Sequence, residues 1–452
     1  MTTRVIIVRH GQSTHNTEHR IQGRSDESIL TEKGRAMARQ VGDTLADIPI
    51  EAIYSSPLRR ASETAEIVKT SLQESQGKTL PLEISQNLIE VDLPLWENLP
   101  RDEVMAKYPQ QYECWKQRPQ ELKMADPRRE NPQEFFPVLS LYEQAKRFWS
   151  LLLERHQRET VLVVAHNGIN RCLLMSALGI DPRYYHSIQQ SNCCINVVNF
   201  SGGWGSKAQL ESLNLLAHQG KNFPEPRDPN SGLRLLLVRH GETQWNQEGR
   251  FQGQIDVPLN ENGRHQAYQA AQFLQDVSLD AAISSPMLRP KETAEIILQE
   301  HSGVALELME GLREISHGLW EGKLEAEIWD SYSELLNSWK VAPETVQMPE
   351  GENLQQVWDR SQVALEEIVR KHYDPSQYRT VMVVAHDAIN KAILCHLFGL
   401  GAQNFWTFKQ GNGSVSVIDY PQGLDAYPQL QAANITTHLG GGVFDSTAAG
   451  AL

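Results

Sequence analysis

A six-residue motif that could bind and attack an anion occurs twice in the chain. Val-Arg-His-Gly-Gln-Ser spans residues 8–13, and Val-Arg-His-Gly-Glu-Thr spans residues 238–243. Each copy continues a short apolar run, 5–8 or 235–238, of the kind that forms a buried strand. Ligands of open α/β sheets bind beyond the carboxyl ends of the strands. A guanidinium, an imidazole and a glycine at that position therefore predict a site for an anion such as phosphate.

A second apolar run in each half also ends in histidine. Residues 163–166 read Val-Val-Ala-His, and residues 383–386 repeat this sequence. If both runs are strands of one sheet, they bring two imidazoles to the same edge in each half. One such histidine is equally well explained as a buried core residue. Equivalent pairs in both halves favour catalysis.

Three further residue types recur near these histidines. An arginine lies in the first turn of the helix predicted after Ser-Ser-Pro, where free backbone N–H groups also favour anions. A glutamate follows the third predicted strand, and an asparagine follows each Arg-His-Gly segment. The pairs are Arg60 and Arg289, Glu90 and Glu314, and Asn16 and Asn246.

These motifs occur in the same order in both halves, which predicts a tandem duplication. The offset falls from 230 residues for Arg9 and Arg239 to 220 for His166 and His386, as deletions in loops would produce. The boundaries that we predict are a first domain over 1–220, a linker over 221–232, a second domain over 233–440 and a flexible tail over 441–452.

Strands alternate with helices in each predicted unit, and their apolar runs are continuous. This pattern is typical of an α/β fold with a mostly parallel sheet and helices on both faces. In the first unit we predict strands over 4–8, 52–55, 83–85, 161–165, 194–200 and 209–215, and helices over 31–45, 57–72, 141–155 and 168–178. Residues 91–140 are polar and rich in proline, and we interpret them as an insertion over the site.

Composition excludes several classes of protein. The formal net charge of −14 over 452 residues argues against general binding of nucleic acid or anionic membranes. No apolar run approaches the ~18 residues that a membrane span requires, and no secretory signal is visible, so a cytoplasmic location is expected. The five cysteines form no CxxC pair and no zinc-type cluster, and we expect free thiols, with Cys193 and Cys194 on a strand.

Taken together, these residues resemble the histidine phosphatase superfamily, whose fold is phosphoglycerate-mutase-like, and the resemblance covers nearly the whole chain twice. It implies two tandem domains of this fold and a phosphoric monoester hydrolase that needs no metal and no cofactor. The catalytic residues that it implies are His10, Glu90, His166, His240, Glu314 and His386, and the substrate-binding residues are Arg9, Asn16, Arg60, Arg239, Asn246 and Arg289.

The resemblance also implies a role for each group. The first histidine of a unit attacks phosphorus and forms a phosphohistidine, which requires a neutral ring whose tautomer a backbone contact would fix. The arginines and the second histidine surround the phosphoryl oxygens. The glutamate protonates the leaving oxygen, a role that suits a carboxyl group whose pKa is raised by burial.

Several alternatives remain open at this point. The resemblance implies that the partner is a small phosphorylated metabolite of the sugar-phosphate type, with 2-carboxy-D-arabinitol 1-phosphate and phosphoserine as candidates. The chain could instead be a phosphoglycerate mutase, which would require 2,3-bisphosphoglycerate, or one domain could bind a phospholigand while the other is catalytic. The sequence leaves the oligomeric state open. It also leaves open the loop after Glu90, because the first unit lacks the glycines found at 318 and 322.

Overall fold

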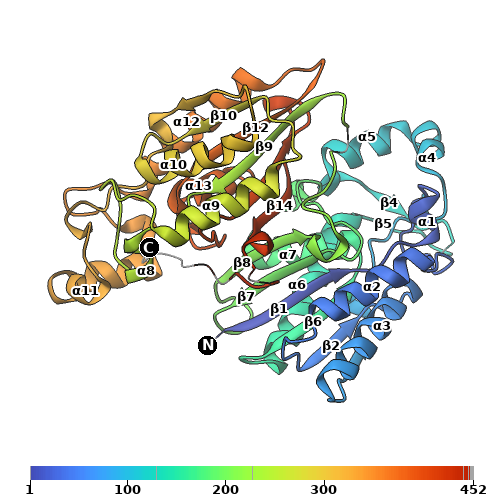
Figure 1. The fold of residues 1–452 in the computed structure, drawn as a ribbon. Helices are drawn as coiled ribbons and strands as arrows, with labels where there is room; N and C mark the ends of the chain where they lie inside the picture. The colour runs from blue at the N-terminus through green and yellow to red at the C-terminus, as the bar shows by residue number, and fades with distance from the viewer. Residues whose placement is uncertain (1, 129, 227, 441, 446, 448–452) are drawn as a thin grey trace. The chain divides into compact units, whose positions relative to one another are not determined.

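The computed structural model describes residues 2–128, 130–226, 228–440, 442–445 and 447. The chain divides into two compact units, Met1–Pro224 and Glu225–Leu452 (Figure 1). Part of the predicted tail over 441–452 lies outside the described residues. Among the described helices, none combines the length and the apolar character needed to cross a membrane.

The strands of unit 1 follow the order β8-β7-β1-β6-β2-β3. Their bounds are β1 (Thr3–Arg9), β2 (Ala52–Ser55), β3 (Leu82–Ile84), β6 (Thr160–Ala165), β7 (Ile195–Phe200) and β8 (Ala208–Leu215). The pairs β1–β6, β6–β2 and β2–β3 are parallel, whereas β7 and β8 are antiparallel additions. Arg9 pairs with Ala165. The residues that follow β1 and β6 therefore leave the sheet at the same edge, as the sequence predicts.

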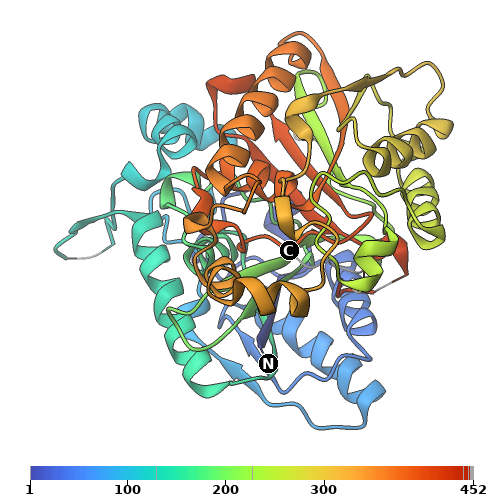
Figure 2. The same ribbon diagram turned by 90° about the vertical axis from the view of Figure 1, so that its left-hand side faces the viewer.

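Two helix pairs flank this sheet. Helix α2 (Glu32–Thr44) packs against α3 (Arg59–Gln76), and α6 (Pro137–Arg155) packs against α7 (Asn167–Leu178). The two pairs lie on opposite faces of the strands (Figures 1 and 2). The core strands are buried on both sides, with 0% exposure for each residue from Val5 to Val8. This arrangement explains why those strands are apolar at every position.

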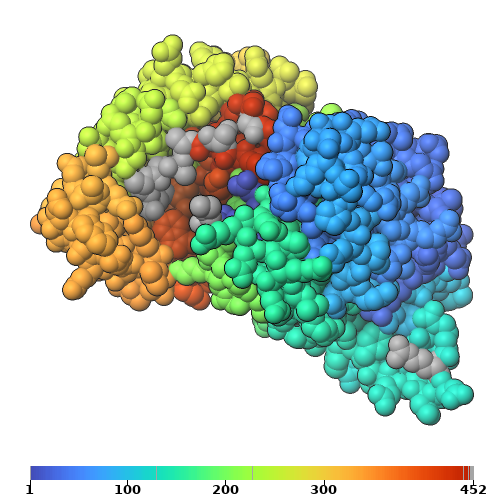
Figure 3. Space-filling view, turned by 90° about the horizontal axis from the view of Figure 1, so that it is seen from below, coloured from blue at the N-terminus to red at the C-terminus, as the bar shows by residue number. Residues whose placement is uncertain are grey.

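Unit 2 repeats the arrangement, with strand order β11-β10-β12-β9-β13-β14. The strands are β9 (Gly232–Arg239), β10 (Ala281–Ser284), β11 (Leu306–Leu308), β12 (Tyr378–Ala385), β13 (Val415–Tyr420) and β14 (Gln429–Ile435). The helix pairs are α9 (Glu261–Leu274) with α10 (Leu288–Ile297), and α12 (Leu354–His372) with α13 (Asp387–His396). An additional helix, α11 (Glu325–Val341), protrudes at the periphery of this unit, in orange in Figure 3.

The structure differs from the predicted elements in several places. Helix α6 begins at Pro137, four residues before its predicted start, and α3 continues to Gln76. The segment 91–140 contains α4 (Arg101–Lys107), α5 (Pro109–Gln117) and a short hairpin of β4 (Met124–Ala125) and β5 (Glu134–Phe135). Helix α3 begins two residues after Pro57 rather than at it. The prediction that Cys193 and Cys194 lie on a strand is wrong, because Cys193 adopts a left-handed turn (φ 51°) and β7 begins at Ile195. Both thiols are nevertheless buried and unpaired, as are Cys172 and Cys395, while Cys114 is unpaired and half-buried.

Candidate active site

The Arg-His-Gly segment of each unit extends the first strand into the site. The backbone N–H of His10 donates to Ala165 O at 2.9 Å, which continues the sheet one residue beyond Arg9. Nδ1 of His10 lies 2.7 Å from Gly11 O, and Nδ1 of His240 lies 2.7 Å from Gly241 O. A carbonyl accepts only from a protonated nitrogen, so this contact favours the tautomer whose Nε2 lone pair can attack phosphorus.

The glycine after each histidine permits a close approach to the helix pair. A Cβ on Gly11 would lie 2.4 Å from Gly34 O, and one on Gly241 would lie 2.2 Å from Gly263 O. The backbone N–H of Gly11 donates to Thr64 Oγ1 of α3 at 3.1 Å. The segment that carries the first histidine is therefore tied to the start of α2 and to α3.

The second histidine of each unit faces the first. The ring centroids of His10 and His166 lie 5.2 Å apart, and those of His240 and His386 also lie 5.2 Å apart. Nε2 of His166 contacts Ser56 Oγ at 2.7 Å, and Nε2 of His386 contacts Ser285 Oγ at 2.9 Å. Among the described residues, Nδ1 of both second histidines is buried without a hydrogen-bond partner.

Two guanidinium groups lie beside each histidine pair, and hydrogen bonds to backbone carbonyls hold these guanidinium groups in place. Arg60 donates to Gly23 O at 3.0 Å and to Ser25 O at 2.8 Å, and Arg9 donates to Gln190 O at 2.7 Å. Yet Nε of Arg9 and Nε of Arg60 are buried donors without a partner in the described part of the chain. Such donors are costly unless a ligand satisfies them, and an oxyanion fits their charge.

The guanidinium groups of unit 2 repeat this pattern with two differences. Nε of Arg239 is again buried and without a partner among the described residues, but Nε of Arg289 donates to His240 Nε2 at 3.2 Å. Arg289 also donates to Gly253 O at 2.9 Å. The contact with Nε2 independently indicates that this nitrogen of His240 carries the lone pair. In addition, Asp387 lies 3.6 Å from Arg239 and forms an ion pair with Lys391, at positions where unit 1 has asparagine and arginine.

Burial keeps the site histidines uncharged. It lowers the pKa of His10 well below its usual value, and the neighbouring charges of Arg60 and Arg9 lower it further. His240 has a lowered pKa for the same reasons, burial first and then Arg289 and Arg239. The pKa values of the two second histidines are also lowered well below the usual value, chiefly by burial. All four rings are therefore neutral at neutral pH, as a nucleophile requires.

The glutamate of each unit lies at the N-terminus of the helix that follows the second histidine. The Glu90 carboxylate accepts from the N–H groups of Val91, Gly168 and Ile169 at 2.8–3.0 Å. Glu314 accepts from Ile315 N at 3.0 Å and from a single N–H of α13 at 3.5 Å. Burial raises the pKa of Glu314, and the charge of Asp387 raises it further.

The predicted asparagines organise the loop after the first histidine. The Oδ1 atoms of Asn16 and Asn246 accept from the backbone N–H of Ser13 and Thr243, both at 3.1 Å, and so cap the short helices α1 (Thr14–Thr17) and α8 (Gln244–Glu248). Nδ2 of Asn192 joins Asn16 Oδ1 at 3.2 Å to His10 O at 2.9 Å. A direct contact of these asparagines with substrate stays a prediction.

The structure thus brings together within each unit both histidines, both arginines and the glutamate that the sequence singled out. Sequence reasoning missed the polar residues that hold them. These residues are Ser56, Thr64 and Asn192 in unit 1 and Ser285, Thr293 and Asn412 in unit 2. Each of the three residues in unit 1 has an identical counterpart in unit 2, and this identity between the halves could have identified them from the sequence.

The loop after the glutamate keeps one of its two left-handed turns without the glycines. Gly318 is left-handed (φ 53°), but unit 1 has Pro94 at this position, where the ring fixes φ at a negative value. Gly322 adopts a left-handed conformation (φ 82°), and Asn98 adopts one at the equivalent place in unit 1 (φ 66°). Asparagine tolerates this region better than other residues with a side chain. Asn98 also donates to Glu27 at 2.8 Å and contacts His15 Nε2 at 3.0 Å, which stabilises the turn. Within the described residues, no group of three His, Cys, Asp or Glu side chains is placed to hold a metal ion.

Comparison with known proteins finds one family model that matches both halves, relatives that cover about half of the chain, and relatives that cover nearly all of it. The model of the histidine phosphatase superfamily (branch 1) matches residues 5–214 and again residues 235–433. A 2-carboxy-D-arabinitol-1-phosphatase of Triticum aestivum is 31% identical over 97% of this chain and 86% of that protein. Phosphoserine phosphatase 1 of Hydrogenobacter thermophilus is 36% identical over 46% of this chain and 95% of that protein. A solved mycobacterial glucosyl-3-phosphoglycerate phosphatase is 28% identical, covers 45% of this chain and 100% of its own, and superposes with a TM-score of 0.42.

Proposed function

Because the chain belongs to the histidine phosphatase superfamily and is a phosphoric monoester hydrolase, we propose that both units hydrolyse a small acidic phosphate ester through a phosphohistidine. The observation that carries this proposal is a set of buried nitrogen atoms beside a neutral histidine pair that have no partner among the described residues: Arg9 Nε, Arg60 Nε and His166 Nδ1 in unit 1. These atoms suit a bound phosphoryl group, and positioning and charge stabilisation supply most of the catalysis of phosphoryl transfer.

The reaction proceeds in two steps, transfer of the phosphoryl group to the histidine and then to water. Nε2 of His10 attacks phosphorus while the bond to the ester oxygen breaks, and Glu90 gives its proton to the leaving alkoxide. A water molecule then attacks the phosphohistidine, Glu90 takes the proton of that water, and inorganic phosphate and neutral His10 are released. Arg9, Arg60 and His166 hold the phosphoryl oxygens throughout. His240, Glu314 and their neighbours perform the same steps in unit 2.

The substrate that we favour is a sugar-acid phosphate such as 2-carboxy-D-arabinitol 1-phosphate. The support is the full-length relative from Triticum aestivum, which has that activity by name and aligns over both units. Phosphoserine is the next candidate, because a phosphoserine phosphatase aligns with about one half of the chain. We propose no metal and no organic cofactor for either ester, and a cytoplasmic location stays a prediction.

The test is a panel of phosphate esters assayed with and without a chelator. We expect phosphate release from 2-carboxy-D-arabinitol 1-phosphate to exceed release from phosphoserine and 3-phosphoglycerate, and EDTA to leave the rate unchanged. Acid quenching during turnover should trap phosphate on a histidine. Isomerisation of 3-phosphoglycerate faster than its hydrolysis, in the presence of 2,3-bisphosphoglycerate, would instead identify a mutase.

A further inference from the structure

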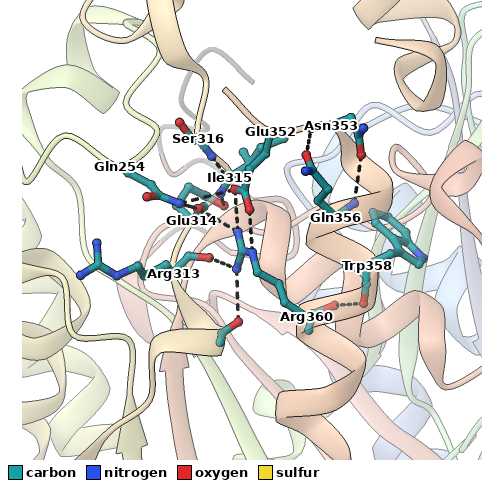
Figure 4. A network of polar contacts seen from close by, with 12 residues as sticks. Gln254, Arg313, Glu314, Ile315, Ser316, Glu352, Asn353, Gln356, Trp358 and Arg360 are labelled. Carbon is teal, nitrogen blue, oxygen red and sulfur yellow. Dashed lines mark hydrogen bonds and ion pairs between the residues drawn. The ribbon is translucent and has the colours of Figure 1, made fainter. Parts of the chain in front are cut away.

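The guanidinium group of one arginine donates hydrogen bonds to the backbone carbonyls around Glu314. Arg360 of α12 donates through Nη1 to Gly311 O at 3.2 Å and to Arg313 O at 2.5 Å. Its Nη2 donates to Glu314 O at 2.9 Å. Gln254 donates to the same Glu314 carbonyl at 3.0 Å (Figure 4). Four hydrogen bonds therefore fix the segment on which the proposed general acid is mounted.

A carboxylate completes this network on the other side of the segment. Glu352 receives Nε and Nη2 of Arg360, both at 3.0 Å, in a bidentate ion pair. Its Oε2 also accepts from Ser316 N at 2.8 Å (Figure 4). The adjoining glycine of the Gln254 loop accepts from Arg289 at 2.9 Å. The network thus joins the backbone of Glu314 to the loop that holds a phosphate-binding arginine.

Unit 1 holds the corresponding carbonyls with the same two side-chain types in exchanged positions. Gln144 of α6 donates to Asn87 O at 3.1 Å and to Ile89 O at 2.8 Å, the counterparts of Gly311 and Arg313. It therefore occupies the place of Arg360.

The guanidinium of unit 1 comes instead from the loop after the first helix. Arg24, which aligns with Gln254, donates to Glu90 O at 3.1 Å and reaches Gln144 Oε1 at 3.4 Å. It pairs with Asp92 at 3.3 Å, which takes the role of Glu352. Each unit therefore uses one arginine, one glutamine and one carboxylate, but the arginine and the glutamine come from opposite elements.

Resting on the function proposed above, we infer that Arg360 in unit 2 and Arg24 in unit 1 are positioning residues for the general acid. Each works together with a glutamine, and the arginine and the glutamine can exchange places between the helix and the loop. One guanidinium and one amide supply the donors that these carbonyls need, and one carboxylate balances the charge. Two glutamines leave carbonyls under-satisfied, whereas two arginines bring a second cation beside one carboxylate.

The consequence for catalysis that distinguishes two esters lies in the first step, in which Glu314 protonates the leaving oxygen. A displaced Glu314 donates its proton poorly to the leaving oxygen, which slows esters whose alkoxide needs that proton. p-Nitrophenolate leaves without protonation, so formation of the phosphohistidine from p-nitrophenyl phosphate does not need the acid. Hydrolysis of the phosphohistidine needs Glu314 with either ester, so the two esters are compared at the first step. A merely structural role of Arg360 would lower the rates with both esters equally.

The experiment uses the full chain with His10→Ala, which leaves unit 2 as the active unit. In this background, rapid acid quenching measures the rate of phosphohistidine formation. Arg360→Gln should lower this rate by ~30–100-fold with 2-carboxy-D-arabinitol 1-phosphate, with KM within about threefold, and change it by less than about threefold with p-nitrophenyl phosphate. Adding Gln254→Arg recreates the arginine–glutamine order of unit 1 and should restore the rate of phosphohistidine formation to within about fivefold of the background. Arg370→Gln, at the exposed end of the same helix, is the matched control.

Two results would overturn the inference: equal losses with both esters, or a double variant as slow as Arg360→Gln alone. If Arg360→Gln fails to fold, the mirror series of Arg24→Gln with and without Gln144→Arg, in a His240→Ala background, decides by the same criteria. Failure of the proposed function is distinguishable, because the His10→Ala background itself would then form no phosphohistidine on unit 2.

Discussion

The imidazole rings of His10 and His166 lie with their centroids 5.2 Å apart, although they follow different strands. The parallel register of β1 and β6 produces this distance, because Arg9 lies opposite Ala165 and both chains leave the sheet together. His240 and His386 repeat the distance at 5.2 Å in unit 2. Two neutral rings with lowered pKa values therefore lie at one sheet edge, where we propose that one attacks phosphorus and the other contacts the phosphoryl oxygens.

The first prediction concerns the two nucleophiles. His10→Ala and His240→Ala should each remove the phosphohistidine of their own unit, and the double variant should lose ~10³-fold or more of the phosphate release. Acid-quenched labelling followed by peptide mapping measures both effects. His265→Ala, on the exposed side of α9, is the control. A double variant that retains half the activity would refute the proposed nucleophiles, and a single variant that retains all or none would show that only one unit is catalytic.

The second prediction concerns the pH dependence of unit 2. Glu314 must be protonated to act as the acid, and burial raises its pKa above the usual value of 4.5. Its protonated form therefore persists to higher pH than that of an ordinary glutamate, and turnover of an alkyl ester should fall as pH rises through the raised pKa. We expect this decline in the His10→Ala chain and its disappearance in the slower Glu314→Gln variant. A decline of equal shape in both chains would assign it to another group.

The third prediction concerns stability. The pKa of His386 in the folded chain lies well below 6.5, so between these values the unfolded chain binds a proton that the folded chain does not. The free energy of unfolding should therefore fall as pH drops below 6.5, by roughly 1.4 kcal/mol per pH unit for each such imidazole. Urea titrations between pH 5 and 7 should show a shallower decline for His386→Gln than for the parent chain. Parallel declines would contradict the assignment of a neutral, buried ring.

The sequence predicts the strands and the strand ends well because each carries a local signal. Continuous apolar runs define β1 and β6, and the histidines follow them directly. The networks that hold the site are different, because their members meet only in the folded chain. Gln144 and Arg360 donate to equivalent backbone carbonyls, but they differ in residue type and belong to no shared motif. Comparison of the two halves therefore does not reveal that they have the same role. The short helices α4 and α5 were missed because their segment is polar and interrupted by prolines, a composition that favours loops.

The fourth prediction concerns the glycine after each nucleophile. A Cβ at Gly241 would lie 2.2 Å from the backbone oxygen of Gly263, and neither backbone can move without disturbing the start of α9. Gly241→Ala should therefore destabilise unit 2 by ~1–3 kcal/mol and slow phosphohistidine formation. Thermal unfolding measures the first effect and rapid quenching the second. Gly203→Ala, where a Cβ meets nothing within 4 Å, should leave both unchanged. Equal unfolding temperatures and equal rates of phosphohistidine formation in the two variants would show that the close approach at Gly241 matters for neither stability nor catalysis.

Each unit contains a full set of the predicted site residues, from the Arg-His-Gly segment to the glutamate and the hydrogen-bond network around its backbone. If both units hydrolyse an ester as proposed, substitutions in one unit can change its ester without altering the residues of the other site. The buried aspartate and lysine of unit 2, where unit 1 has asparagine and arginine, show that the two copies have already begun to diverge.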